Sequence, residues 1–483
     1  TRTEPFKAEP DTSKQKKPTT SSFADVYPRP EFGRSHIPDQ PAKLLIRGAK
    51  IWTSGPQGNL DSGDMLVEKG KIVSVSSHID APSDAVIVDA KGMNLTAGII
   101  DCHSHTGTAG DVNEVGSAIT AEVRIGDNLS GDDIADYREL AGGTTTANVL
   151  HGSANPIGGQ NQVVKWRWGM LPEELKFENA MPGVKFALGE NPKQSNWGDR
   201  NTTRYPQTRE GVEQIIRDEF HAAQDYTKAQ TEFKDGKRKI PVRRDLQLDA
   251  VAEILNGTRL VHSHSYRQDE IEMLMHVSDD FGFRIGTFQH VLEGYKIADV
   301  LAAHGVGAST FSDWWAYKYE VIDAIPYNGA LMHDQGVVVS YNSDSDEQAT
   351  RLNTEAAKAM KYGGVSPQEA LKFVTINPAI QLHIDKRVGS LEPGKDADFV
   401  LWNGDPLSTY TIALQTWVDG RKFFDRDEDL KMQDEIQKER AALIQKALGE
   451  KKDDTGGAPT GGGRGRRPRT ESGDDDFSKE GGR

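Results

Sequence analysis

The stretch "GIIDCHSHTG" (residues 98–107) is a short run of small and apolar residues that ends in Asp101, His103 and His105. In a β-strand, side chains two residues apart face the same side, so both imidazoles would point in one direction. A His-x-His pair in this geometry is a common way to hold one divalent metal ion. The stretch therefore predicts a buried strand that delivers metal ligands at its end.

The surrounding region, residues 97–384, alternates apolar strand candidates with helical patterns. The helical candidates include residues 211–229, 269–281 and 294–305. The strand candidates are "AGIID", "GTTTANVL", "QNQVVKW", "GVKFAL", "TRLVH", "FRIGTFQH", "GVGASTF" and "GVVVSYN". Eight β/α pairs in a segment of this length predict an α/β fold with a (β/α)8 TIM-like barrel. A doubly wound open sheet would carry a Gly-rich phosphate loop after its first strand, where this chain has histidines.

The two ends of the chain flank this region with a different pattern. Residues 43–96 and 385–425 contain short β-branched runs broken by Gly and Asp, which predict one small β-sandwich completed from both ends. Residues 1–42 are expected to form a flexible arm, residues 426–451 a helix packed on the surface, and residues 452–483 a disordered tail.

The bulk composition excludes several classes of protein. The formal net charge is −15, which argues against a nucleic-acid or anionic-membrane binder. The sequence contains no run of 18 apolar residues, so no membrane span is predicted. The single cysteine, Cys102, excludes an intrachain disulfide. The chain starts at Thr1, which fits a removed leader or a part of a longer product. The compartment is undecided, with export to the periplasm or outside the cell favoured over the cytoplasm.

Ligand-type residues recur at the ends of the predicted strands. The fourth strand is followed by Glu190, the fifth ends in His262 and His264, the sixth ends in His290, and the eighth is followed by Asp344. Each residue alone has an ordinary structural explanation. Their recurrence at the same end of five strands predicts a metal site, because barrel enzymes place their reacting groups there.

The stretch "AGIIDCHSH" resembles the first-strand signature of the amidohydrolase superfamily, with Ala97 where proline is usual. Residues 282–306 and 366–406 resemble the sixth strand and helix and the closing segment of its imidazolonepropionase-like and prolidase-like members. The resemblance covers about residues 43–425. It implies that a metal is held by His103, His105, a fifth-strand histidine, His290 and Asp344. It favours His262 over His264, and Glu190 over a carboxylated Lys185 at the fourth strand.

The chemistry implied by this resemblance is hydrolysis of a carbon–nitrogen bond in an amide, a peptide-like substrate or a cyclic amide. One or two zinc ions are expected, with manganese, iron or cobalt as substitutes. Asp344 would act as the general base toward a water activated by the metal.

The sequence offers candidates for substrate binding and leaves two other functions open. Candidate substrate-binding residues are His151, Arg267, Trp314 and Tyr317; structural packing or an Arg267 ion pair explains them equally well. The expected partner is a small molecule or short peptide, with a homo-oligomer or larger assembly through the arm and tail as a further possibility. Two other functions remain open: a non-catalytic scaffold subunit, and a deaminase that uses Glu270 or Glu272 as its proton shuttle.

Overall fold

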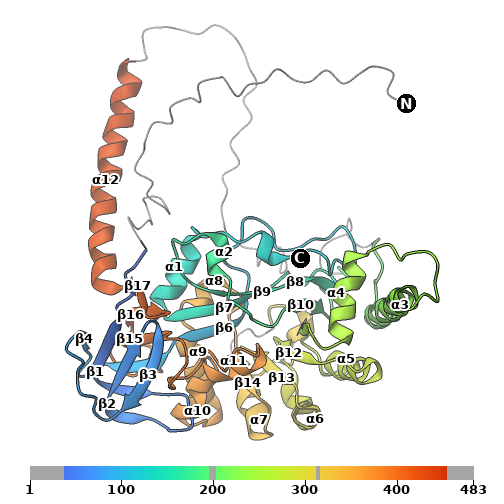
Figure 1. Cartoon of the computed structure of the whole chain (residues 1–483), viewed down its shortest axis with the longest axis horizontal. Helices are drawn as coiled ribbons and strands as arrows, with labels where there is room; N and C mark the ends of the chain where they lie inside the picture. The colour runs from blue at the N-terminus through green and yellow to red at the C-terminus, as the bar shows by residue number, and fades with distance from the viewer. Residues whose placement is uncertain (1–36, 195–202, 312–315, 454–483) are drawn as a thin grey trace.

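The computed structural model describes residues 37–194, 203–311 and 316–453 (Figure 1). The predicted arm and tail therefore lie largely outside the described residues. In the described part, the strands form one large end sheet and two smaller sheets surrounded by helices.

The end sheet takes strands from both ends of the chain. Its order is β17-β16-β15-β5-β1-β2-β3, and β4 pairs with β1. The strands are β1 (Lys43–Trp52), β2 (Leu60–Glu68), β3 (Lys71–Ser76), β4 (Val86–Asp89), β5 (Asn94–Ala97), β15 (Phe399–Trp402), β16 (Ala413–Val418) and β17 (Arg421–Asp425). The two ends meet where β5 and β15 pair antiparallel, with Ala97 opposite Phe399. The two ends thus combine in one hydrogen-bonded set of eight strands, as expected for a unit completed from both ends of the chain.

The middle of the chain forms a TIM-barrel-like arrangement in two sheets, ordered β14-β13-β12-β11-β10-β8 and β6-β7-β9. The strands are β6 (Ile99–Ser104), β7 (Thr144–Val149), β8 (Ile157–Gln160), β9 (Gln162–Lys165), β10 (Gly183–Ala187), β11 (Leu260–His264), β12 (Ile285–Gln289), β13 (Gly307–Thr310) and β14 (Val339–Tyr341). β6 with β7, and β10 through β14, pair in parallel. Their residues are almost all buried, as expected for parallel strands covered on both faces.

The prediction that the third strand candidate runs parallel to the second is wrong. β9 pairs antiparallel with β7, and the additional strand β8 pairs antiparallel with β10. The segment between β7 and β9, residues 150–161, contains β8 and no helix. A parallel connection usually crosses over through a helix. This helix-free segment instead returns the chain to β9, antiparallel to β7.

No ladder joins β14 to β6 in the described part of the chain. The two strands are instead connected just beyond their ends, where the amide of Asp344 donates to the carbonyl of His103 over 3.2 Å. The backbone amide of Ser343 also donates to Asp101 Oδ1 over 3.1 Å. These contacts bring the first and last strands of the barrel-like region together at the end that carries the histidines.

Helices cover the outside of these sheets (Figure 1). They are α1 (Ile134–Ala141), α2 (Pro172–Leu175), α3 (Arg209–Lys234), α4 (Leu246–Leu255), α5 (Gln268–Phe281), α6 (Ala298–His304), α7 (Asn328–Asp334), α8 (Asp346–Ala349), α9 (Leu352–Gly363), α10 (Pro367–Lys372), α11 (Ile376–Gln381) and α12 (Arg426–Asp453). The helical spacing of apolar residues explains how these helices pack. In α5, the side chains of Ile271, Leu274 and Met275 form one buried stripe. The helix ends at Gly282, whose φ of 73° suits a glycine cap.

α12 extends away from the body, at the left of Figure 1. Its Leu430, Leu443 and Leu448 side chains are about half exposed. Only its first turns are anchored, where Tyr137 Oη donates to Asp429 Oδ1 over 2.9 Å. The expected packing along the body is therefore wrong beyond these turns, because charged residues surround the helix and leave no apolar stripe to bury. None of the described helices is long and apolar enough to span a membrane.

A buried ion cluster joins the barrel-like region to the end sheet. Lys165, at the end of β9, has a side chain with no exposure. Its Nζ lies 2.7 Å from Asp396, 2.9 Å from Asp398 and 2.6 Å from Asp419, which flank β15 and β16. One cation thus connects the two parts of the fold through three carboxylates.

Candidate metal centre

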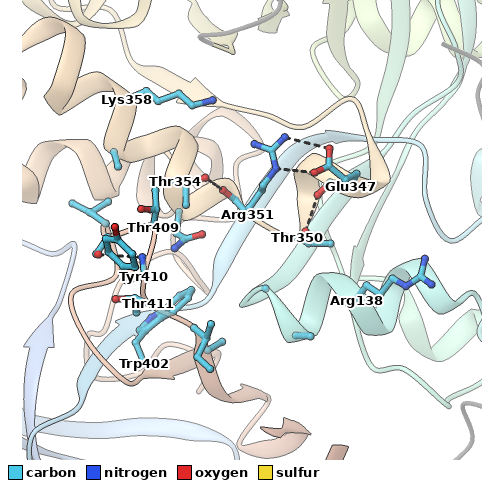
Figure 2. Close-up of a pocket in the computed structure, with 18 of the residues that line it drawn as sticks. Arg138, Glu347, Thr350, Arg351, Thr354, Lys358, Trp402, Thr409, Tyr410 and Thr411 are labelled. Carbon is cyan, nitrogen blue, oxygen red and sulfur yellow. Dashed lines mark hydrogen bonds and ion pairs between the residues drawn. The ribbon is translucent and has the colours of Figure 1, made fainter. Parts of the chain in front are cut away.

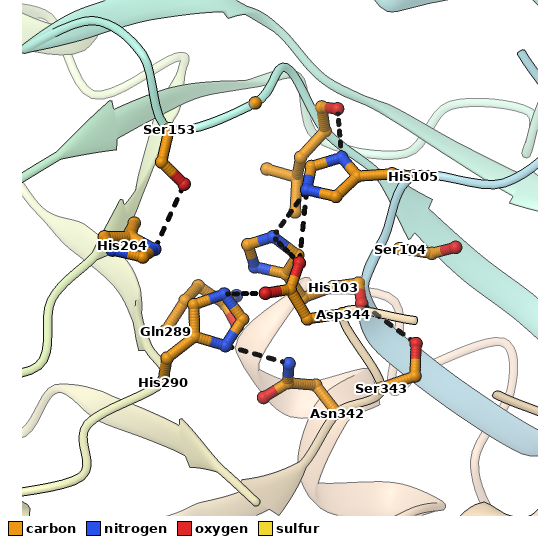
Figure 3. A network of polar contacts seen from close by, with 12 residues as sticks. His103, Ser104, His105, Ser153, His264, Gln289, His290, Asn342, Ser343 and Asp344 are labelled. Atoms are coloured by element: carbon orange, nitrogen blue, oxygen red, sulfur yellow. Dashed lines mark hydrogen bonds and ion pairs between the residues drawn. The ribbon is translucent and has the colours of Figure 1, made fainter. Parts of the chain in front are cut away.

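The end of β6 places two imidazoles against one carboxylate (Figure 3). The Nε2 atoms of His103 and His105 lie 3.3 Å apart. Asp344 Oδ1 lies 3.4 Å from His103 Nε2 and 3.2 Å from His105 Nε2. The ligand atoms of these three residues all lie within 4.8 Å of one another, which is the spacing that a shared metal ion requires.

Asp344 reaches this position through a strained backbone. Its φ is 50°, and His290 has a φ of 60°, both in the left-handed region that residues other than glycine rarely adopt. The Asp344 turn is held by the hydrogen bond from its amide to the carbonyl of His103. Backbone strain of this kind concentrates at functional sites, where the surrounding structure holds it in place.

Two further imidazoles lie at this centre, one of them against the same carboxylate. His290, directly after β12, places Nε2 3.5 Å from Asp344 Oδ2. His264, at the end of β11, has its ring centroid 5.2 Å from that of His290. Both Nε2 atoms are buried and have no hydrogen-bond partner in the described part of the chain. Unsatisfied buried nitrogens are costly, and a metal ion is a partner that would satisfy them.

The fifth and fourth strands differ from the sequence expectation. His262 lies two residues deeper than His264, level with Lys185 in the paired strands β10 and β11. Lys185 is nevertheless close to the imidazoles, with Nζ 3.2 Å from His103 Nε2 and 3.1 Å from the carbonyl of His151. From this level, the long side chain of Lys185 extends to the imidazoles at the strand ends, whereas the shorter side chain of His262 does not.

Glu190 lies in the loop after β10. Its backbone amide donates to Glu320 Oε1 over 3.0 Å. No contact of its carboxylate with the imidazoles is found among the described residues. The structure thus brings together His103, His105, His264, His290, Asp344 and Lys185, and leaves His262 and Glu190 outside this group.

The electrostatics of the centre suit a cation. Burial lowers the pKa of His290 to about 3, and it lowers the pKa of His103 and His264 well below the usual range. These imidazoles are therefore neutral near pH 7 and offer lone pairs. Burial alone would raise the pKa of Asp344, but the adjacent His290 and His105 hold it at about 2.

Residues that the sequence did not single out orient the imidazoles (Figure 3). Ser153 Oγ lies 3.1 Å from His264 Nδ1, and Asn342 Nδ2 lies 3.1 Å from His290 Nδ1. Partners on the second ring nitrogen fix the orientation of metal-binding histidines. Nothing in the sequence distinguishes Ser153 from other loop serines, although Asn342 could have been suspected from its place beside Asp344.

The side chains of two expected substrate-binding residues, His151 and Arg267, form hydrogen bonds or ion pairs within the protein. The two ring nitrogens of His151 are occupied by the amide of Glu114 (2.8 Å) and the carbonyl of Gly152 (2.8 Å). Arg267 pairs with Asp269 at 3.0 and 3.2 Å. Trp314 lies outside the described residues.

Tyr317 lies near the centre. Its hydroxyl lies 2.6 Å from that of Tyr266, and the Tyr266 ring packs edge-on against His264 with centroids 4.4 Å apart. Tyr317 is thus separated from the candidate metal ligands by one aromatic ring.

The sequence model of the amidohydrolase family matches residues 94–423. A curated relative from Hapsidospora irregularis, amidohydrolase tasK, is 33% identical over 426 residues, which cover 79% of this chain and 43% of the relative. An imidazolonepropionase from Thermoplasma volcanium is 28% identical over 160 residues, 31% of this chain and 39% of the relative. The chain thus matches less than half of the length of these relatives.

The solved structure of an amidohydrolase from Thermotoga maritima aligns with a TM-score of 0.73 at 32% identity, covering 79% of this chain and all of that chain. The extent of the family match and the agreement of the two folds lead to one conclusion. The chain belongs to the amidohydrolase family.

Proposed function

We propose that this protein is a metal-dependent hydrolase of carbon–nitrogen bonds, acting on an amide, a peptide-like substrate or a cyclic amide. The observation that carries the proposal is the convergence of three imidazoles, two of them fully buried, on the Asp344 carboxylate, with the buried Nε2 atoms of His264 and His290 lacking a hydrogen bond in the described part of the chain. Family membership supports hydrolysis of carbon–nitrogen bonds in general.

The residues that would hold one or two ions are His103, His105, Lys185, His264, His290 and Asp344. Neutral imidazole with carboxylate suits zinc, which is the ion we propose. When bound, such an ion lowers the pKa of a water and polarises a substrate carbonyl. The remaining chemistry falls to side chains of the chain itself.

Asp344 is proposed to move the proton. Because its pKa is held at about 2, its carboxylate is ionised near pH 7 and can accept a proton from the attacking water. It would then donate that proton to the leaving nitrogen. Its exposed fraction of 15% leaves it accessible from the mouth of the site, while His103 and His290 are fully buried.

Lys185, rather than Glu190, is proposed as the fourth-strand ligand, in the form of a carbamate. Its Nζ already lies against His103 Nε2, and a carbamate would replace this contact between two nitrogens by carboxylate oxygens. The loop position of Glu190 offers no such contact.

The two alternatives are less well supported. A deaminase shuttle at Glu270 conflicts with its burial and its ion pair to Arg209. A non-catalytic scaffold does not require the strained Asp344 backbone that directs a carboxylate toward three imidazoles.

The test is turnover of an amide and cyclic-amide library by the metal-loaded protein and its Asp344→Asn variant. We expect a loss of about 10²–10⁴-fold in kcat, the usual contribution of a general base. Asp346→Asn is the matched control, since Asp346 is exposed two residues away, and it should keep wild-type turnover. Release of ammonia from purines or pyrimidines without amide turnover would favour the deaminase. A metal-loaded protein inactive on the whole library would favour the scaffold.

A further inference from the structure

A groove of about 1220 Å³ lies outside the metal centre, between α1, the α8–α9 segment, the loop joining β15 to β16 and the first residue of α12 (Figure 2). It shares none of the residues that converge around Asp344. Its volume exceeds the roughly 300–1,000 Å³ typical of small-molecule sites, so the groove has room for a small molecule. Because its lining residues are separate from the metal centre, a ligand in the groove would not depend on the proposed function.

Positive charge gathers in this groove although the chain has a net charge of −15. The lining contains two acidic residues, Asp346 and Glu347, and five basic residues from three helices: Arg138, Arg351, Lys358, Lys361 and Arg426. A concave surface lined by one sign of charge concentrates ions of the opposite sign.

Two of these five cations have no carboxylate partner in the described part of the chain, whereas two others do. Arg351 pairs with Glu347 at 3.0 and 3.2 Å, and Lys358 contacts Glu355. By contrast, Arg138 and Lys361 form no ion pair within the described ranges. Both are exposed and line the groove, Arg138 from α1 and Lys361 from α9.

The floor and the rim of the groove differ in polarity. The floor includes the buried Trp402 and Ala413, exposed by 2% each. On the rim, Tyr410 is 93% exposed and Ile412 is 47% exposed, which leaves apolar surface facing solvent beside the cations. A bound molecule could cover this surface with an apolar body while its acidic groups meet the basic side chains.

We propose that this groove is a second binding site, for a small organic anion that carries at least two negative charges on an apolar body. Carboxylate and phosphate groups share the chemistry that arginine and lysine recognise. Arg138 and Lys361 are the principal anchors, because no carboxylate of the described chain competes for them.

The experiment is calorimetric titration of the full metal-loaded chain with isophthalate and, separately, with phenyl phosphate. These probes distinguish a carboxylate from a phosphate ligand, and neither has the geometry to chelate a single metal ion through adjacent acidic groups. Benzene-1,3-dimethanol is the neutral probe of similar shape. We expect saturable one-to-one binding of at least one anion, weakened by salt, and no binding of the neutral diol.

The double variant Arg138→Glu with Lys361→Glu should weaken anion binding by at least about tenfold, the consequence of losing one charged hydrogen bond. The matched control reverses two exposed lysines of α3, Lys228→Glu with Lys234→Glu, and should retain wild-type affinity. Thermal melts of both variants check folding. Equal affinities for wild type and the groove variant, absence of saturable binding by both anions, or equal binding of the neutral diol would each overturn the proposal.

Discussion

At the scale of single residues, side-chain length decides which groups reach the metal centre. Lys185 and His262 lie at the same level of adjacent strands, yet only the lysine contacts His103. His264, two residues further along β11, is the histidine that approaches His290. The depth of a residue along its strand and the length of its side chain therefore decide together which candidates reach the centre.

The first prediction concerns the fourth-strand ligand. The variant Lys185→Gln should lose most of its bound zinc, because an amide cannot form a carbamate. Glu190→Gln is the matched control and should retain zinc at the wild-type ratio. Elemental analysis of the purified proteins measures both, and native mass spectrometry should detect the carbon dioxide adduct only in wild type and the control. Loss of zinc from Glu190→Gln with full retention in Lys185→Gln would reverse the assignment.

The sequence could predict some of these residues and not others. The spacing of His103 and His105 predicts a shared direction, and Asp344 stands directly after an apolar run. Both His262 and His264 face the interior by the same two-residue rule, so the pattern alone cannot rank them. Glu190 was favoured because it follows the end of the fourth strand, where a ligand is expected, whereas the reach of the buried Lys185 side chain depends on the strand register.

At the scale of secondary-structure elements, α1 carries a buried acid without a partner. Asp136 is fully buried, and neither carboxylate oxygen has a hydrogen bond in the described part of the chain. Burial, together with the adjacent Asp133, raises the pKa of Asp136 well above its usual value. The folded protein therefore keeps the Asp136 carboxyl protonated at pH values where the unfolded chain has released its proton.

This proton predicts a pH-dependent stability. For a carboxyl whose pKa is raised in the folded state, the stability contribution is complete below the unfolded pKa and is lost as pH rises toward the folded pKa. Asp136→Asn should therefore gain stability over wild type as pH increases from about 5 to about 8. Melting temperatures across this range test it, with the exposed Asp132→Asn as the control. A difference between Asp136→Asn and wild type that does not change with pH would contradict the account.

The elements also show where pattern analysis is insufficient. The apolar stripe of α5 and its terminal Gly282 are local features, and the helix lies where the sequence indicates. The direction of β9 is not local, because it depends on the length of the connection from β7 and on the pairing partner. An apolar run of four residues has no feature that separates a parallel strand from an antiparallel one.

At the scale of the whole molecule, Lys165 connects the two parts of the fold. Lys165→Met should lower the free energy of unfolding by about 3–5 kcal/mol, since it leaves the buried Asp398 without an ion pair in the described part of the chain. Asp396 and Asp419 would keep Arg387 and Arg167 as partners. Lys71→Met is the control, because Lys71 contacts the same Asp396 from a side chain that is 49% exposed. It should cost no more than about 1 kcal/mol. Chemical denaturation measures both, and equal losses would argue against a special role for the buried cation.

The joining of the two chain ends was predictable, because both carry the same short β-branched runs. The strands that join the two ends, β5 and β15, are set by their antiparallel pairing, which the local pattern does not specify. The sequence predicts the α12 helix, but packing on the body was expected, and the extension of the helix from the body reflects its lack of an apolar stripe.

We propose that side chains from the ends of five strands, β6, β10, β11, β12 and β14, converge on one or two divalent cations. The most direct test is an anomalous difference map, recorded at the zinc edge, from crystals of the zinc-loaded protein. The account predicts a peak about 2.0–2.1 Å from the Nε2 atoms of His103 and His105, adjacent to Asp344 and to His264 rather than His262. Zinc-soaked crystals with well-ordered imidazoles and no peak between them would contradict it.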